Sequence, residues 1–137
     1  MSPPPHAAPA IPVHALVVDD DEFVRGTLVR QLKTVGAASV ASARDWGAAR
    51  VLLAQDPACN VVISDLDMPG AGGSDFLDEL AALRPGIALI IVSASEPVVL
   101  RTAERHARRL PLAVLGSIAK PPSVDALRAL LGALPGA

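Results

Sequence analysis

The chain has 137 residues, of which 51% are hydrophobic and 19% charged, which suits one folded domain with its own core. A net charge of −2 and only 2% aromatic residues argue against a nucleic-acid-binding domain, which needs a basic surface or stacking rings. No apolar run is long enough to span a membrane, and the N-terminus lacks a secretory signal pattern. We therefore expect a cytoplasmic protein that binds neither nucleic acid nor membrane. The single cysteine, Cys59, is expected to be a small buried side chain.

The first part of the chain differs in composition from the rest. Residues 1–12 hold five prolines, which predicts a disordered leader, followed by one folded domain over residues 13–137. Within that domain, short apolar runs predict five strands. They cover residues 15–18, 37–41, 61–64, 88–92 and 112–118. The first, third and fourth runs are almost entirely apolar, as in parallel strands that are covered on both faces.

Amphipathic segments follow each apolar run, and their apolar residues recur every three or four positions, which predicts helices. The second helix is a short one over residues 46–54. The apolar faces of the other four, in chain order, are Val24, Leu28, Leu32 and Val35; Phe76, Leu80 and Leu83; Leu100, Ala103, Ala107 and Leu110; and Val124, Leu127, Leu131 and Leu134. Ser123 is the expected N-cap of the last helix. Strict alternation of five strands and five helices predicts an α/β fold, a doubly wound parallel sheet with helices on both faces.

Polar side chains follow four of the predicted strands, and in such sheets ligands bind beyond the carboxyl ends of the strands. These residues are Asp19 and Asp20, Asp65, Ser93 and Lys120. If the strand order is 2-1-3-4-5, the fifth strand lies about 10 Å from the third. Only a long side chain can cross that distance, and lysine is the residue found there.

The chemistry of these residues suits phosphoryl transfer. Several carboxylates at one sheet edge repel each other unless a cation is present, and hard oxygen ligands favour Mg²⁺. The carboxylate of Asp65 would be the nucleophile. The ammonium of Lys120 and the hydroxyl of Ser93 would stabilise the phosphoryl oxygens. The sequence therefore predicts a site that forms an acyl phosphate on Asp65.

Four linked motifs resemble those of response-regulator receiver domains in two-component systems, of the chemotaxis-regulator type. They are residues 17–22, 63–70, 92–94 and 119–121, and the resemblance extends from about Val13 to Leu134. It implies the flavodoxin-like strand order 2-1-3-4-5. It also implies that the domain accepts a phosphoryl group from a histidine kinase or phosphotransfer protein and switches a partner or attached effector. Such a domain is no enzyme beyond its own phosphorylation and dephosphorylation.

The resemblance also implies roles for individual residues. Asp65 would be the phosphoacceptor, and Mg²⁺ would be bound by Asp20, Asp65 and the backbone carbonyl of Asp67, with Asp19 acting through water. Ser93 matches the switch Ser/Thr of the family, and Lys120 matches its lysine.

One position departs from the family pattern. Three residues before the lysine, where the family usually has Tyr, Phe or His, this chain has Ser117. A signal would then have to travel through Ser93 and the loop over residues 94–97.

Three arginines follow helical spacing on the fourth predicted helix, at Arg101, Arg105 and Arg108. They fit a solvated helix face. The alternative is an output surface, between the fourth and fifth helices, for an effector domain, an acidic partner or a second copy of the chain.

Two other functions compete with a phosphorylated receiver. Asp65-Leu66-Asp67 after an apolar strand also resembles the start of a Mg-dependent haloacid-dehalogenase-type phosphatase, although the acids of that family come late in the chain and its members usually carry a cap domain. A degenerate receiver used only for docking is the second alternative, which Ser117 keeps open.

Overall fold

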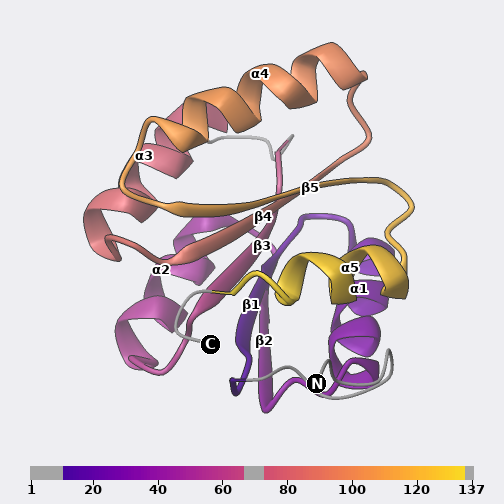
Figure 1. The fold of residues 1–137 in the computed structure, drawn as a ribbon. Helices are drawn as coiled ribbons and strands as arrows, with labels where there is room; N and C mark the ends of the chain where they lie inside the picture. The colour runs from indigo at the N-terminus through magenta and orange to yellow at the C-terminus, as the bar shows by residue number, and fades with distance from the viewer. Residues whose placement is uncertain (1–10, 67–72, 135–137) are drawn as a thin grey trace.

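Strands and helices alternate along the whole described part of the chain, residues 11–66 and 73–134 of a computed structural model (Figure 1). Their order is β1 (His14–Val18), α1 (Glu22–Thr34), β2 (Ser39–Ala43), α2 (Trp46–Gln55), β3 (Val61–Asp65), α3 (Gly73–Leu83), β4 (Ala88–Ser93), α4 (Pro97–Arg108), β5 (Ala113–Ala119) and α5 (Val124–Leu131). Residues 1–10 of the predicted leader, and Asp67, lie outside the described residues.

The five strands form one parallel sheet in the order β2-β1-β3-β4-β5, as predicted. β1 and β3 are neighbours, with β2 beside β1 on one side and β4 and β5 following β3 on the other. Their register pairs Val18 with Ser64, and β3 in turn pairs Asp65 with Val92 of β4. The carboxyl ends of β1, β3 and β4 therefore lie level at one edge of the sheet, where strand order reverses and ligands bind.

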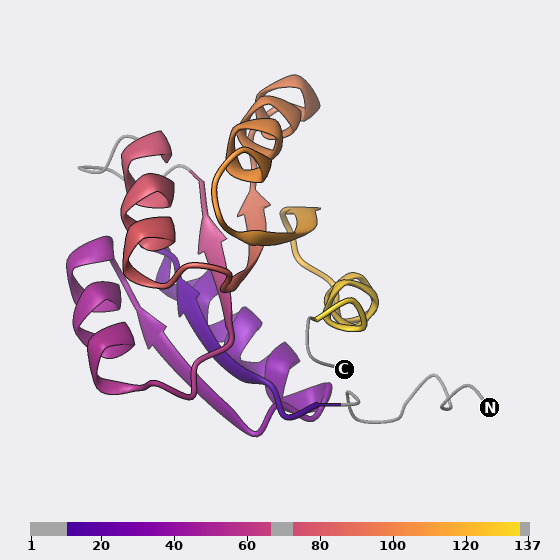
Figure 2. The ribbon, with the colours of Figure 1, turned by 60° about the vertical axis from the view of Figure 1, so that its left-hand side comes forward.

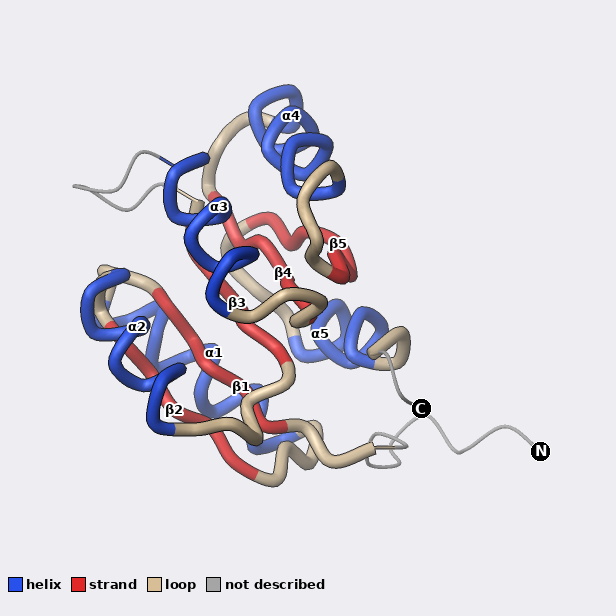
Figure 3. Tube along the Cα trace, turned by 90° about the vertical axis from the view of Figure 1, so that its left-hand side faces the viewer, coloured by secondary structure: helices blue, strands red, loops and turns tan. Residues whose placement is uncertain are grey.

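The helices cover both faces of the sheet, as Figures 2 and 3 show. Helices α2, α3 and α4 pack with Leu16, Val62 and Leu89 on one face, whereas α1 and α5 pack with Val17, Ile63 and Ile90 on the other. Adjacent strand residues thus enter opposite cores, because side chains alternate along a strand. This two-sided burial explains why β1, β3 and β4 read as continuous apolar runs. Phe76 and Cys59 are buried, as predicted, and so is Trp46.

The second strand begins two residues later than the sequence predicts. Gly36 has a φ of 91°, and the amides of Ala37 and Ala38 donate to Leu32 and Val13. Ala37 therefore closes the end of α1, and Ala38 bonds to the residue before β1, so neither belongs to β2. β2 is an edge strand in which only Ala43 is buried, so its apolar signal is weak.

Helix starts follow the expected capping chemistry where the side chains are short and polar. Ser123 caps α5, with its hydroxyl accepting from the Ala126 amide at 3.1 Å, which confirms the prediction. Asp21 caps α1 by accepting from the amides of Phe23 and Val24 at 2.8 and 3.2 Å. Among the described residues, no helix is long and apolar enough to cross a membrane.

Strand β5 contains a bulge before its last four residues. Leu89 pairs with Val114, but Ile90 pairs with Gly116, so Leu115 is an extra residue. Gly116 has a φ of 149°, and a Cβ atom there would lie 2.8 Å from Leu130 Cδ2. The positive φ therefore favours glycine, and a Cβ atom would also force the Leu130 side chain to shift. Beyond the bulge, Ser117 bonds to α4, whereas Ile118 enters the core under α1 and α5.

Candidate functional site

Three carboxylates meet at the carboxyl edge of the sheet. Asp19 follows β1, Asp20 comes next, and Asp65 is the last residue of β3. One oxygen from each lies within 4.8 Å of the others. Asp19 is fully buried and Asp65 is 4% exposed, whereas Asp20 is exposed. The predicted cluster of acids is therefore assembled, with one member open to solvent.

The turn between β1 and α1 is held by bonds to Asp19. The Asp19 amide donates to the carbonyl of Ala43 at 3.1 Å, and its Oδ1 accepts from the Asp21 amide at 2.9 Å. Its carbonyl accepts from Nη1 of Arg25, on the first turn of α1, at 2.8 Å. These contacts fix the backbone on both sides of Asp20, so its exposed carboxylate is presented at the edge of the cluster.

Lys120 reaches the acids from β5, across the width of β4. Its Nζ lies 3.1 Å from Asp19 Oδ2 and 3.4 Å from Asp65 Oδ1, and its side chain is 17% exposed. Burial lowers the pKa of Lys120, but the hydrogen bonds and charges of Asp19 and Asp65 outweigh it, so the pKa is raised overall. A charged ammonium therefore lies beside the two buried carboxylates.

Ser93 completes the edge as the fully buried last residue of β4. Its carbonyl accepts from the Lys120 amide at 2.9 Å, and its Oγ accepts from the Ser95 amide at 2.9 Å. It thus joins the end of β5 to the loop that leads into α4. Asp65, Ser93 and Lys120 occupy three neighbouring strand ends, as the strand-order argument requires.

The donor atoms fit a small hard cation. The three carboxylates offer oxygen ligands on one side, and the exposure of Asp20 leaves access from solvent. Oxygen ligands of this kind, with room for water, suit Mg²⁺. The carbonyl of Asp67, the fourth expected ligand, lies outside the described residues.

Sequence reasoning missed two polar contacts near the site. Arg25 bonds to the backbone of Asp19, and Glu104 of α4 bonds to Ser117 of β5 at 3.1 Å. Arg25 has no distinctive motif. The spacing of Glu104 and Arg108 does indicate an i,i+4 ion pair, which forms at 2.7 Å, so Arg108 is less free than its neighbours Arg101 and Arg105.

Comparison with known proteins identifies the class that this fold and site define. The response regulator receiver domain pattern matches residues 15–131, and the chain belongs to that family. A protein-glutamate methylesterase/protein-glutamine glutaminase 2 from Caulobacter vibrioides is 35% identical over 109 residues, covering 80% of this chain and 30% of the relative. The chain spans only 30% to 39% of the first three curated relatives that it matches.

Solved structures agree on the fold. The Vibrio cholerae chemotaxis protein CheY4 superposes with a TM-score of 0.75 at 19% identity, covering 90% of this chain and 99% of that protein. A Burkholderia pseudomallei response regulator with a phosphorylated aspartic acid, a calcium ion and citrate superposes with a TM-score of 0.72 at 24% identity, covering 87% and 66%. The chain is therefore a receiver domain with a chemotaxis-regulator-like fold.

Proposed function

We propose that Asp65 accepts a phosphoryl group from a histidine kinase or phosphotransfer protein and that this event switches a partner or an attached effector. The observation that carries the proposal is the position of Lys120, which pairs with both Asp19 and Asp65 at the carboxyl edge of the sheet. A lysine drawn into a buried acidic cluster is a counter-charge for anionic chemistry. The phosphorylated aspartic acid in the Burkholderia relative supports the same assignment.

In the proposed reaction, an oxygen of the Asp65 carboxylate attacks the phosphorus of a phosphohistidine. The new P–O bond forms as the P–N bond breaks, and the histidine nitrogen leaves with the bonding electrons. Lys120 and the hydroxyl of Ser93 would contact the phosphoryl oxygens, where negative charge is greatest. When bound, Mg²⁺ would neutralise part of that charge. Asp20, Asp65 and the carbonyl of Asp67 are its proposed ligands, with Asp19 acting through water.

Electrostatics explains why both a cation and a lysine are needed. A phosphoryl group would bring further negative charge to three carboxylates that already lie within 4.8 Å of one another. One ammonium cannot balance that charge, so we expect phosphorylation to require Mg²⁺. Asp19 and Asp65 are buried, whereas Asp20 is exposed, so we expect a donor protein to reach the site from the side of Asp20.

The proposal can be tested by incubating the full chain with Mg²⁺ and acetyl phosphate and then measuring its intact mass. We expect one phosphoryl adduct that is lost without Mg²⁺ and in Asp65→Asn. Asp125→Asn is the matched control, because Asp125 is an almost fully exposed acid on α5. A wild-type chain that forms no adduct would contradict the proposal and leave the docking-only alternative. Continuous turnover of acetyl phosphate without an adduct would favour the phosphatase.

A further inference from the structure

A polar bridge joins α4 to β5 at the position where the family usually has an aromatic residue. Ser117 Oγ donates to Glu104 Oε2 at 3.1 Å. Glu104 Oε1 accepts from Arg108 Nη2 at 2.7 Å, and Arg108 Nη1 donates to the carbonyl of Val114 at 3.2 Å. The side chain of Glu104 is only 22% exposed. We call Ser117, Glu104 and Arg108 the α4–β5 bridge.

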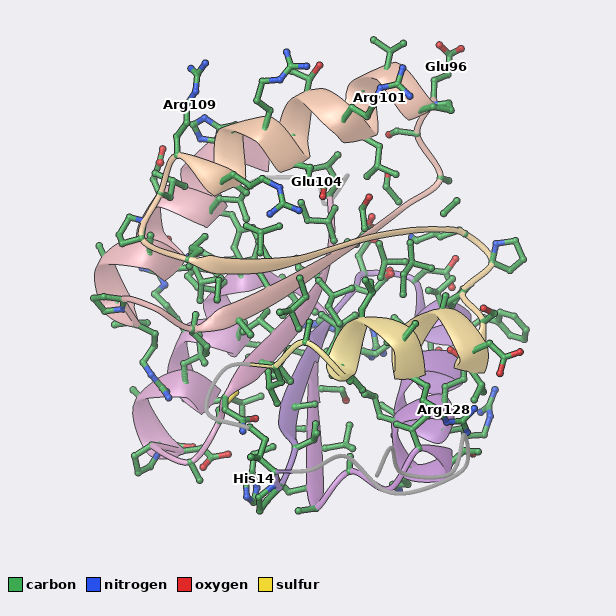
Figure 4. The ribbon with its side chains drawn as sticks, viewed as in Figure 1. His14, Glu96, Arg101, Glu104, Arg109 and Arg128 are labelled. Atoms are coloured by element: carbon green, nitrogen blue, oxygen red, sulfur yellow. The ribbon has the colours of Figure 1, made fainter. Side chains whose placement is uncertain are left out.

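The apolar attachment of α4 to the domain is small, so the bridge matters for where this helix lies. Ala107 is its single buried residue, and Val98 and Val99 are 63% and 49% exposed. Figure 4 shows Glu96, Arg101 and Arg109 pointing away from the domain, whereas Glu104 lies on the side of α4 that faces β5. A buried alanine contributes far less hydrophobic stabilisation than a leucine. Leu100 packs against the core but is only partly buried, so the polar contacts of the bridge add to a small apolar attachment.

Both ends of the bridge connect to the proposed phosphorylation site. On one side, Ser93 leads through the loop at Ser95 into the first turn of α4. On the other side, Ser117 lies three residues before Lys120 on β5, and the Lys120 amide bonds to the carbonyl of Ser93. A change at Asp65 that moves Ser93 or Lys120 therefore acts on α4 and β5, the two elements that the bridge joins.

We propose that the α4–β5 bridge is a regulatory latch that holds α4 in its resting position and opens when Asp65 is phosphorylated. This inference rests on the proposed function, whose output it explains in a chain that lacks the usual aromatic residue. Glu104 and Ser117 are positioning residues, because they act on α4 and do not touch the phosphoryl group. In this chain, the hydrogen bond from Ser117 to the partly buried carboxylate of Glu104 stands where the family usually has an aromatic ring.

Thermodynamic linkage gives the latch a measurable consequence at the distant site. If the bridge favours the resting arrangement, removing it shifts the population toward the arrangement that binds a phosphoryl group better. The loss of one ordinary, partly exposed hydrogen bond corresponds to about a five- to ten-fold change in that equilibrium. The same factor should appear in the affinity for a phosphoryl mimic. A contact that merely stabilises α4 would leave that affinity unchanged.

The test compares the full chain with Ser117→Ala, Ser117→Thr and Glu104→Gln. Beryllofluoride is titrated at saturating Mg²⁺ and followed by heteronuclear NMR, and hydrogen exchange of α4 amides is measured without it. Thr102→Ala is the matched control, because that hydroxyl bonds within α4, to the carbonyl of Val98. We expect Ser117→Ala to bind beryllofluoride about five- to ten-fold more tightly and to exchange α4 amides faster. Ser117→Thr should restore both values, and Glu104→Gln should lie between.

The outcomes separate the latch from the proposed function. Equal beryllofluoride affinity in wild type and Ser117→Ala overturns the latch, even if α4 exchange increases, because the contact would then be structural only. Weaker binding in Ser117→Ala also overturns it. A wild-type chain that binds no beryllofluoride and forms no phosphoryl adduct overturns the proposed function, and the latch with it.

Discussion

Helices α1 and α4 follow strands that end in the same site, yet they are held to the domain in different ways. Helix α1 buries Leu28 and Leu32 and is capped by Asp21, whose carboxylate accepts two amide hydrogen bonds. Helix α4 buries Ala107 alone, and its N-cap residue, Glu96, makes no side-chain capping bond. One helix is fixed by buried leucines and a side-chain cap, whereas the other buries little apolar surface and has no such cap.

This difference separates the two tasks of a receiver. The acids that would hold a cation and the phosphoryl group come from β1 and β3, and the turn of Asp19 and Asp20 leads into the firmly packed α1. Ser93 leads instead into α4, which has few buried apolar contacts. Elements that move in response to a ligand come from the less stable parts of a fold. The α1 side therefore keeps the site in place, and α4 is suited to change position.

The largest expected effect is a difference in stability between core truncations in the two helices. Leu28 is 1% exposed, so Leu28→Ala should lower the free energy of unfolding by about 2–5 kcal/mol. Leu100 of α4 is only partly buried, and Leu100→Ala should cost roughly 1 kcal/mol. Urea denaturation of both variants measures the difference. Equal losses would contradict the idea that α4 is weakly anchored.

The second effect concerns Lys120, whose side chain extends from the end of β5 to Asp19 and Asp65. Lys120→Met removes the ammonium from two buried carboxylates and should lower the free energy of unfolding by roughly 1–3 kcal/mol, less than for a fully buried pair because of partial exposure. Mg²⁺ should restore more stability in this variant than in wild type, since a bound ligand stabilises the folded state.

Thermal unfolding with and without Mg²⁺ checks this expectation. Lys33→Met is the control, because Lys33 is an exposed lysine in the last turn of α1. An equal response to Mg²⁺ in Lys120→Met and wild type would mean that Lys120 does not compete with the ion, and no response in either would mean that the acids do not hold it.

The sequence predicts the parts of the molecule that depend on periodicity and strand order. Buried runs define β1, β3 and β4, and polar residues at their ends predict where Asp65, Ser93 and Lys120 meet. The start of β2 is predicted less accurately, because an edge strand lacks the apolar pattern of a strand that is buried on both faces. The bulge at Leu115 is not predicted either, since it depends on how Gly116 packs against Leu130.

The α4–β5 bridge shows why contacts between elements are harder to predict than the elements themselves. Ser117 is visible in the sequence as a departure from the family, but its partner is not. Glu104 lies 13 residues away, and its direction depends on how α4 rotates over β5. Without the structure, Arg101, Arg105 and Arg108 form one row of charges. The structure instead turns Arg108 toward Glu104 and Val114.

Two substitutions at helix N-caps should change the free energy of unfolding by smaller amounts and in opposite directions. Asp21→Ala removes the N-cap of α1 and should lower the free energy of unfolding by about 1 kcal/mol. Glu96→Ser introduces a good cap at the start of α4, where no side-chain cap exists, and should raise it by about 0.5 kcal/mol. Hydrogen exchange should show each effect in the first turn of the respective helix. A Glu96→Ser variant that leaves α4 exchange unchanged would mean that this end of the helix is already satisfied.

Cys59 gives the smallest effect and separates movement of α4 from unfolding of the domain. It lies just before β3, at the opposite end of the sheet from the site, and is 4% exposed. Burial raises the pKa of the Cys59 thiol, and this effect outweighs the lowering by a backbone hydrogen bond of Val61 and by the charge of Arg84. The folded state therefore holds this proton more tightly than the unfolded state. The thiol's contribution is present below the unfolded pKa of about 8.5 and is lost as pH rises through the folded pKa.

The free energy of unfolding of wild type should consequently fall more steeply above pH 8.5 than that of Cys59→Ala, as measured by urea denaturation at several pH values. Below that pH, the thiol should react with a disulfide reagent only after the domain opens. Ser117→Ala, which releases only α4, should then leave the reaction rate almost unchanged, whereas Leu28→Ala should accelerate it. A comparable acceleration in both variants would show that α4 is part of the global unfolding unit, and the contrast between the two helices would be wrong.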